Sequence, residues 1–100
     1  MSQPLAEQLI LALGNAPDPM SSMTRIHYVL PEPGRVSLRV YAVSGQQVRE
    51  LIDDEVRAAG PHAVSWDGRD GRGRSVASGT YFCRLESESG TVADKMVLMR

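Results

Sequence analysis

A glycine- and charge-rich segment, DGRDGRG at residues 67–73, is the first place in the sequence to look for chemistry. Its acids, Asp67 and Asp70, suggest the spacing of a calcium-binding loop. A calcium loop of the EF-hand type needs oxygen ligands at alternate positions and a glutamate at the twelfth. Here the acids are three residues apart, and arginines stand where ligands would be required. We therefore predict a tight turn stabilised by aspartate side chains and left-handed glycines, and keep Asp67 and Asp70 as weak candidate metal ligands.

The same segment could bind an anion or a phosphate group through Arg69, Arg72 and Arg74. The two aspartates interleave with these arginines and nearly cancel their charge. The loop itself holds no aromatic residue on which a nucleic-acid base could stack. The whole chain has a net charge of −1, which gives no field to attract nucleic acid or an anionic membrane. We therefore interpret the arginines as part of a solvated loop and expect no nucleic-acid partner.

Cys83 is the sole cysteine, so an internal disulfide is impossible. A nucleophilic thiol needs exposure and an activating base, yet the only histidines, His27 and His62, both fall in strand-like patterns. Two histidines and one cysteine are too few for a structural zinc site with the usual ligands. The sequence also lacks the motifs of serine hydrolases, phosphate loops and dinucleotide-binding folds. We expect no enzymatic activity and no cofactor, with Cys83 as a small buried hydrophobe.

Short strands must position these residues, because apolar and polar residues alternate along most of the chain. The predicted strands cover residues 24–30, 35–42, 47–52, 62–66, 80–85 and 91–99. Residues 5–13 are ambiguous: their composition favours a helix, whereas the sandwich context favours a first edge strand at residues 9–13, which we adopt. The polar segment 53–60 is expected to be a connection. This pattern predicts an all-β, seven-stranded antiparallel sandwich of the immunoglobulin or fibronectin III type, with a small barrel as the alternative.

The predicted core consists of the inward residues of these strands. Its members are Trp66, Tyr81, Cys83, Ile26, Tyr28, Leu38 and Val40. Tyr81 stands two residues before Cys83, which is the spacing of a tyrosine corner, whose hydroxyl bonds back across the preceding turn. We expect Trp66 to fill the space between the sheets.

One hundred residues suit a single domain. We assign residues 15–100 to the sandwich and residues 1–14 to an N-terminal segment that is either a first edge strand or a helix. No apolar run approaches the ~20 residues of a membrane span. The apolar run at residues 9–13 is too short for a signal peptide, and Glu7 stands where a positive charge is needed. We therefore expect a fragment of a longer protein or export by another route.

Five segments occur in a fixed order with near-constant spacing: PDPM at 17–20, TRIHY at 24–28, LRVYAVSG at 38–45, GPHAVSWDG at 60–68 and KMVLMR at 95–100. Together they resemble the FlgD-type immunoglobulin-like domain, which overlaps in sequence with the C-terminal sorting domains of type IX secretion cargo. Met20, Ser22 and Ala42 depart from the family pattern, which usually has Phe, Pro and Asp there. These changes blur any sorting signal in the first loop.

The resemblance implies a non-catalytic C-terminal module of a secreted, surface or periplasmic bacterial protein, acting in sorting or anchoring by binding export machinery or parent-protein domains. The alternatives are an assembly scaffold, as in flagellar hook capping, and a carbohydrate-binding accessory domain, for which Tyr41 and Phe82 are the aromatics outside the predicted core. The isolated domain is expected to be monomeric. The residues predicted for recognition lie on the last strand: Lys95, Met96, Val97, Leu98, Met99 and Arg100.

Overall fold

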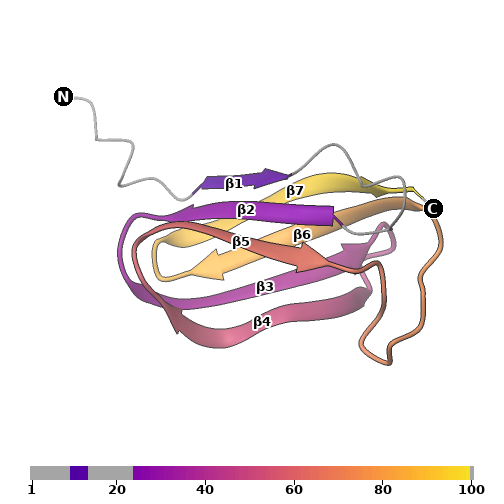
Figure 1. Cartoon of the computed structure of the whole chain (residues 1–100), viewed down its shortest axis with the longest axis horizontal. Coiled ribbons are helices and arrows are strands. Elements are labelled where there is room, and N and C mark those ends of the chain that lie inside the picture. The colour runs from indigo at the N-terminus through magenta and orange to yellow at the C-terminus, as the bar shows by residue number, and fades with distance from the viewer. Residues whose placement is uncertain (1–9, 14–23, 100) are drawn as a thin grey trace.

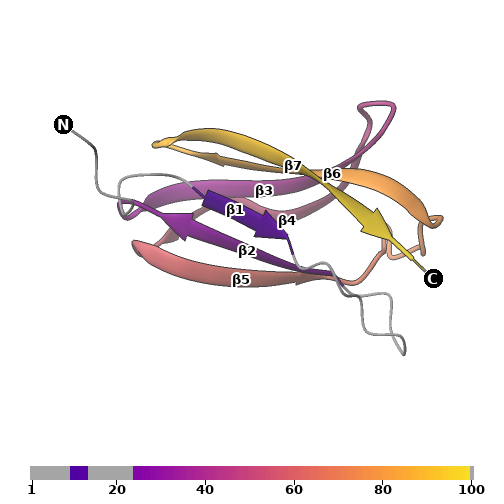
Figure 2. The ribbon, with the colours of Figure 1, turned by 90° about the horizontal axis from the view of Figure 1, so that it is seen from above.

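Two antiparallel β-sheets face each other in the computed structural model, which describes residues 10–13 and 24–99 (Figure 1). One sheet has the strand order β1-β2-β5, with bounds Ile10–Leu13, Thr24–Leu30 and Gly60–Trp66. The other has the order β4-β3-β6-β7, with bounds Gln47–Arg57, Gly34–Ala42, Gly79–Ser87 and Gly90–Leu98. Figure 2 shows the sheets as two layers, with β2 and β5 in one and β3, β6 and β7 in the other. The predicted all-β fold with antiparallel sheets is confirmed.

The core lies between the sheets and is made by alternate residues of facing strands, as the two-residue repeat of a strand requires. In β2 the buried positions are Thr24, Ile26, Tyr28 and Leu30, and the intervening side chains point outward. The other buried apolar residues are Val36, Leu38, Val40, Ile52, Trp66, Tyr81, Cys83, Leu85, Met96 and Leu98. Every residue of the predicted core is therefore buried here.

The structure corrects the prediction that residues 53–60 form a connection. β4 continues to Arg57, and β5 already begins at Gly60. β4 is an edge strand, and residues 53–56 are exposed. Such a stretch shows no alternation of apolar and polar residues, so the pattern that predicted the other strands was missing. Register shifts against β3 and a positive φ of 50° at Asp54 also twist this edge strand. The twist and the charged side chains together hinder pairing of the edge with a strand of another chain.

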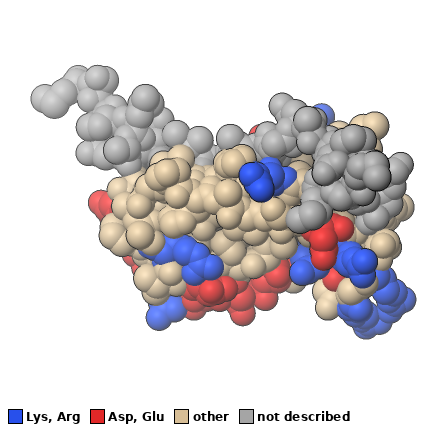
Figure 3. Space-filling model, in the orientation of Figure 1, with Lys and Arg blue, Asp and Glu red and all other residues tan. Residues whose placement is uncertain are grey.

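Charge is distributed unevenly over the surface. In Figure 3, acidic side chains gather along the lower edge, where β4 runs, and basic side chains gather at the lower right, where the loop between β5 and β6 lies. The described part of the chain holds no helix with the length and apolar character needed to cross a membrane.

Candidate functional site

The glycine- and charge-rich segment forms a hydrogen-bonded loop between β5 and β6. Trp66 Nε1 donates to the carbonyl of Arg69 at 2.9 Å, which ties the loop to the core. Asp67 Oδ1 accepts a hydrogen bond from Arg49 Nη1 of β4 at 3.1 Å. Asp70 Oδ1 accepts from the backbone N–H groups of Arg72 at 2.9 Å and Arg74 at 3.0 Å. These bonds are those of an aspartate-stabilised turn.

The candidate metal ligands are therefore engaged in other contacts. Asp67 pairs with an arginine, and the backbone hydrogen bonds from Arg74 and Arg72 lower the pKa of Asp70. Within residues 10–13 and 24–99, no group of three or more His, Cys, Asp or Glu side chains could hold a metal ion. The weak metal site that we considered at Asp67 and Asp70 has no support in this geometry.

Cys83 is fully buried, and desolvation, reinforced by the nearby charge of Asp94, raises the pKa of its thiol to about 12. A thiol with this pKa stays protonated near neutral pH and is a poor nucleophile. Neither histidine is placed to activate it. His27 points outward from β2, while the ring of His62 stacks on Tyr28 at 5.0 Å and its Nε2 lies 2.7 Å from the carbonyl of Ala58. The residues considered for covalent catalysis are not brought together.

Tyr81 makes the bond expected of a tyrosine corner. Its hydroxyl donates to the carbonyl of Ala77 at 2.6 Å, in the turn that precedes β6. Its ring also meets the ring of Trp66 edge to face, with centroids 5.3 Å apart. Trp66 and Tyr81 thus hold the end of the β5–β6 loop against the core, which is a structural role.

The last strand separates into two sets of residues. Met96 and Leu98 point into the core and are 5% and 1% exposed, because alternate residues of a strand point to opposite faces. The prediction that Met96 and Leu98 contact a recognition partner directly is therefore wrong. Lys95, Val97 and Met99 are exposed. Arg100 lies outside the described residues.

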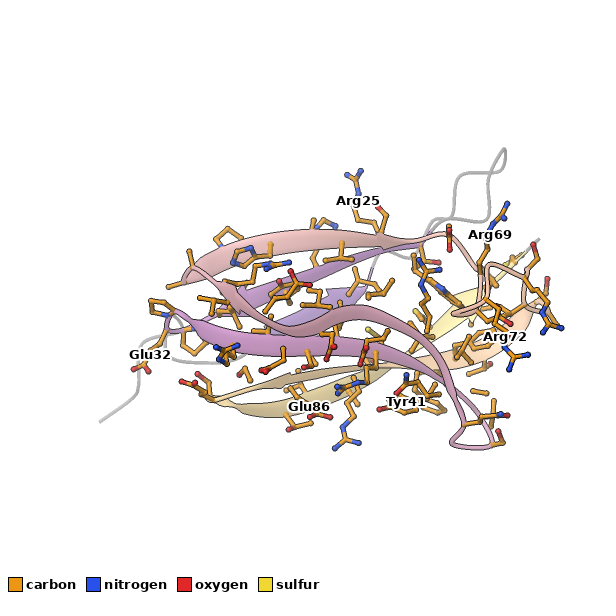
Figure 4. All side chains as sticks on the ribbon, turned by 90° about the horizontal axis from the view of Figure 1, so that it is seen from below. Arg25, Glu32, Tyr41, Arg69, Arg72 and Glu86 are labelled. Atoms are coloured by element: carbon orange, nitrogen blue, oxygen red, sulfur yellow. The ribbon has the colours of Figure 1, made fainter. Side chains whose placement is uncertain are left out.

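The outward residues of β7 join two aromatic residues on the outer face of the four-stranded sheet. The register places Tyr41 of β3 opposite Phe82 of β6, and Phe82 opposite Lys95 of β7. Directly opposite residues of antiparallel strands share a face, and Val97 follows on that face, opposite Thr80. Phe82 is 37% exposed and Val97 53% exposed. We call Tyr41, Phe82 and Val97 the apolar strip; Figure 4 shows Tyr41 on the outward side of this sheet, with Arg25 on the opposite side of the molecule.

Ion pairs lie beside the apolar strip on the same face. Arg39 Nε donates to Glu50 Oε2 at 2.8 Å, which raises the pKa of Arg39. Glu86 Oε1 lies 3.1 Å from Arg84 Nε and 3.5 Å from Arg39 Nη1. Arg39 and Arg84 are directly opposite each other in the register, so Glu86 offsets a repulsion between like charges. The outer face therefore combines an apolar strip with a polar border.

Sequence reasoning had separated Tyr41 and Phe82 from the core but could not place them together. They belong to strands that pair across a long interval of sequence, and β4 and β5 lie between them in the chain. The signal available in the sequence was that each residue occupies an outward-facing position in its predicted strand. The missing information was the register between those strands.

Comparisons with known proteins agree with the fold. The FlgD Ig-like domain family matches residues 21–91. The crystal structure of FlgD from P. aeruginosa is similar, with a TM-score of 0.59, 21% identity and coverage of 89% of this chain and 72% of that one. The crystal structure of FlgD from Xanthomonas campestris is also similar, with a TM-score of 0.53 and 20% identity. Its description refers to insights into the hook capping essential for flagellar assembly. The match covers 90% of this chain and 64% of that one.

A search of curated proteins finds no match to this chain. The identities to the solved structures are low enough that those structures support the fold alone. The matches give no support to the predicted overlap with type IX sorting domains.

Proposed function

Because this chain belongs to the FlgD Ig-like domain family, we propose that it is a non-catalytic assembly module that binds another protein. Membership of this family, rather than any match to sorting domains, favours a scaffold role over a role in sorting. We propose an exported or surface location as part of this role, and a monomeric state for the isolated domain.

The proposed binding surface is the outer face of the four-stranded sheet. The observation that carries the proposal is the exposure of Phe82 and Val97 beside Tyr41 on one sheet face. Aromatic side chains are enriched at the centres of protein interfaces, and a polar border helps to exclude water around them. The fitting partner is a protein subunit that presents apolar side chains to the strip and polar groups to the Arg84–Glu86 pair.

The sorting hypothesis would use the same surface. Met96 and Leu98 are in the core, so among the described residues predicted for recognition a receptor could contact Lys95, Val97 and Met99. Lys95 and Val97 lie on the face that carries the apolar strip. The two hypotheses therefore differ in the identity of the partner, an assembly subunit or a component of the export machinery, and an experiment must identify that partner.

Site-specific photo-crosslinking in the native cell tests the proposal. A photoreactive phenylalanine analogue replaces Phe82 in one variant and Ala63 in another, since Ala63 is exposed on the outer face of the other sheet. We expect a discrete adduct from position 82, and mass spectrometry then identifies the crosslinked protein as an assembly subunit. Adding Val97→Asp should abolish this adduct, because a charge at the centre of an apolar contact is not compensated.

Equal adducts from positions 82 and 63 would contradict the choice of surface. An adduct from position 82 with a component of an export machine would support the sorting hypothesis against the scaffold role. Thermal melting of the Val97→Asp variant serves as the folding control, and we expect little change because Val97 is 53% exposed.

A further inference from the structure

A second surface feature lies at the end of the sandwich that carries the β5–β6 loop. A cleft of about 540 Å³ opens between this loop and the turn from β3 to β4. Its polar lining includes Gln46 and Gln47 on one side and Asp70, Arg72 and Arg74 on the other. We propose that this cleft binds an acidic peptide segment. The proposal does not depend on the outer face, because none of these residues belongs to the apolar strip.

The walls of the cleft are held in place by backbone hydrogen bonds. Gly71 N–H donates to the carbonyl of Val48 at 3.0 Å, which fastens the loop to β4. Within the loop, Asp70 N–H donates to the carbonyl of Arg74 at 2.8 Å. Across the cleft, Ala42 N–H donates to the carbonyl of Gln46 at 2.9 Å and closes the turn. Walls fixed in this way reduce the ordering cost that a ligand would meet.

The positive charge of this cleft is offset only in part, by the Asp70 carboxylate, whose pKa the charges of Arg74 and Arg72 help to lower. The sequence interleaves aspartates and arginines here, but the Asp67 carboxylate pairs with Arg49 of β4. The Asp70 carboxylate accepts backbone hydrogen bonds from Arg72 and Arg74. Among the described residues, no ion pair engages the guanidinium group of either arginine. The cleft thus has two arginines against one aspartate, and Figure 4 shows Arg72 directed outward at this end.

The chemistry of the lining selects a class of ligand. Guanidinium groups bind carboxylates through paired hydrogen bonds. The amides of Gln46 and Gln47 can both donate to and accept from a peptide backbone. The lining formed by the described residues offers no aromatic surface for the stacking of a nucleic-acid base. Two cationic side chains on one wall and two amides on the other suit the carboxylates and backbone of a peptide segment better than one compact ion.

Fluorescence anisotropy with a labelled hexaglutamate peptide tests this proposal on the full chain. We expect saturable binding that weakens as salt rises, since exposed charges are screened. The double variant Arg72→Ala/Arg74→Ala should weaken binding by about tenfold or more, because it removes both charge-assisted contacts. The charge-matched control Arg25→Ala/Arg35→Ala removes two exposed cations elsewhere and should leave the affinity within about twofold. Melting curves establish that both variants are folded.

Three outcomes would overturn the proposal. Equal losses in the cleft variant and its control would mean that the peptide responds only to overall charge. Displacement of the peptide by an equal concentration of inorganic phosphate would mean that the cleft recognises a compact anion. Tighter binding of an oligothymidine of matched charge would favour nucleic acid. Amide shifts in an NMR titration with hexaglutamate should centre on Gln46 and Gly71, and shifts confined to other surfaces would also contradict the proposed site.

Discussion

Tyr41 and Phe82 lie directly opposite each other on β3 and β6, on the face turned away from the core. Their neighbours Val40 and Cys83 are opposite each other in the same register and are fully buried. One pair of strands therefore supplies the centre of the core on one face and the aromatic part of the proposed binding surface on the other. A slip of one residue would exchange the two sets, so core packing fixes the register that forms the surface.

The outward position of Phe82 predicts a small contribution to stability. Phe82→Ala should lower the free energy of unfolding by about 1–2 kcal/mol, since 37% of the residue is already exposed to solvent. Leu85→Ala on the same strand should cost about 2–5 kcal/mol, because Leu85 is fully buried. Urea unfolding measures both changes. Equal losses would mean that Phe82 is packed as a core residue and would remove it from the proposed surface.

Tyr81→Phe tests the tyrosine corner. The variant keeps the ring against Trp66 but removes the hydroxyl that donates to Ala77. The carbonyl then lacks its partner, and we expect a loss of about 1–1.5 kcal/mol in the free energy of unfolding. Tyr41→Phe is the matched control, with an expected change within about 0.5 kcal/mol because that side chain lies on the outer face. If the two variants are equally stable, the bond to Ala77 does not stabilise the fold.

Tyr28→Phe should have the opposite effect to Tyr81→Phe. Tyr28 is 1% exposed, and its hydroxyl is buried without a hydrogen-bond partner among the described residues. Burial raises the pKa of Tyr28, and the charge of Arg57 and the closeness of its guanidinium group to the hydroxyl oppose this shift only in part. The guanidinium group is therefore a near neighbour, but it makes no hydrogen bond of good geometry with this hydroxyl. Removing the hydroxyl should leave stability unchanged or raise it by about 1 kcal/mol, because an unpaired polar atom leaves the core. A loss in thermal melting comparable to that of Tyr81→Phe would indicate a bound partner for this hydroxyl.

Trp66 combines full burial with a hydrogen bond to the β5–β6 loop. Trp66→Ala should cost about 3–5 kcal/mol, as for other large core truncations. Trp66→Phe keeps much of the apolar volume but removes the indole N–H, so its cost should be smaller and should include about 1 kcal/mol for the lost bond. Chemical denaturation compares the two. Equal stability of wild type and Trp66→Ala would contradict the buried position.

The alternation of apolar and polar residues was sufficient to predict much of this fold. It correctly separated inward from outward residues in segments such as 24–30 and 80–85, because each has one face in the core and one in solvent. It missed the second half of β4, where residues 53–56 are exposed and no alternation exists.

The candidate sites depended on information that the sequence pattern does not contain. The apolar strip needs the register between β3 and β6, which lie far apart in the chain. The loop at 67–74 needs the directions of its side chains. Counting charges predicted that the aspartates neutralise the arginines, whereas Asp67 turns to Arg49. Asp70 is held by backbone hydrogen bonds and offsets only part of the charge of Arg72 and Arg74.

The turn at Asp70 predicts a specific response to acid. Backbone hydrogen bonds from Arg74 and Arg72 lower the pKa of this carboxyl below its ordinary value. A group whose pKa is lower in the folded state stabilises the fold when ionised, so the contribution is complete above about pH 4 and is lost as pH falls through the folded pKa. Asp70→Asn keeps an oxygen acceptor but cannot titrate. We expect the variant to melt below wild type at neutral pH, with the difference vanishing in acid.

Melting temperatures measured from neutral pH into the acid range test this expectation. Glu32→Gln, which changes an exposed carboxylate, is the control and should follow the wild-type curve. A difference between Asp70→Asn and wild type that stays constant with pH would mean that the effect is steric. A difference that grows in acid would contradict the sign of the shift, because protonation of Asp70 in the wild type removes the charge that its backbone donors stabilise.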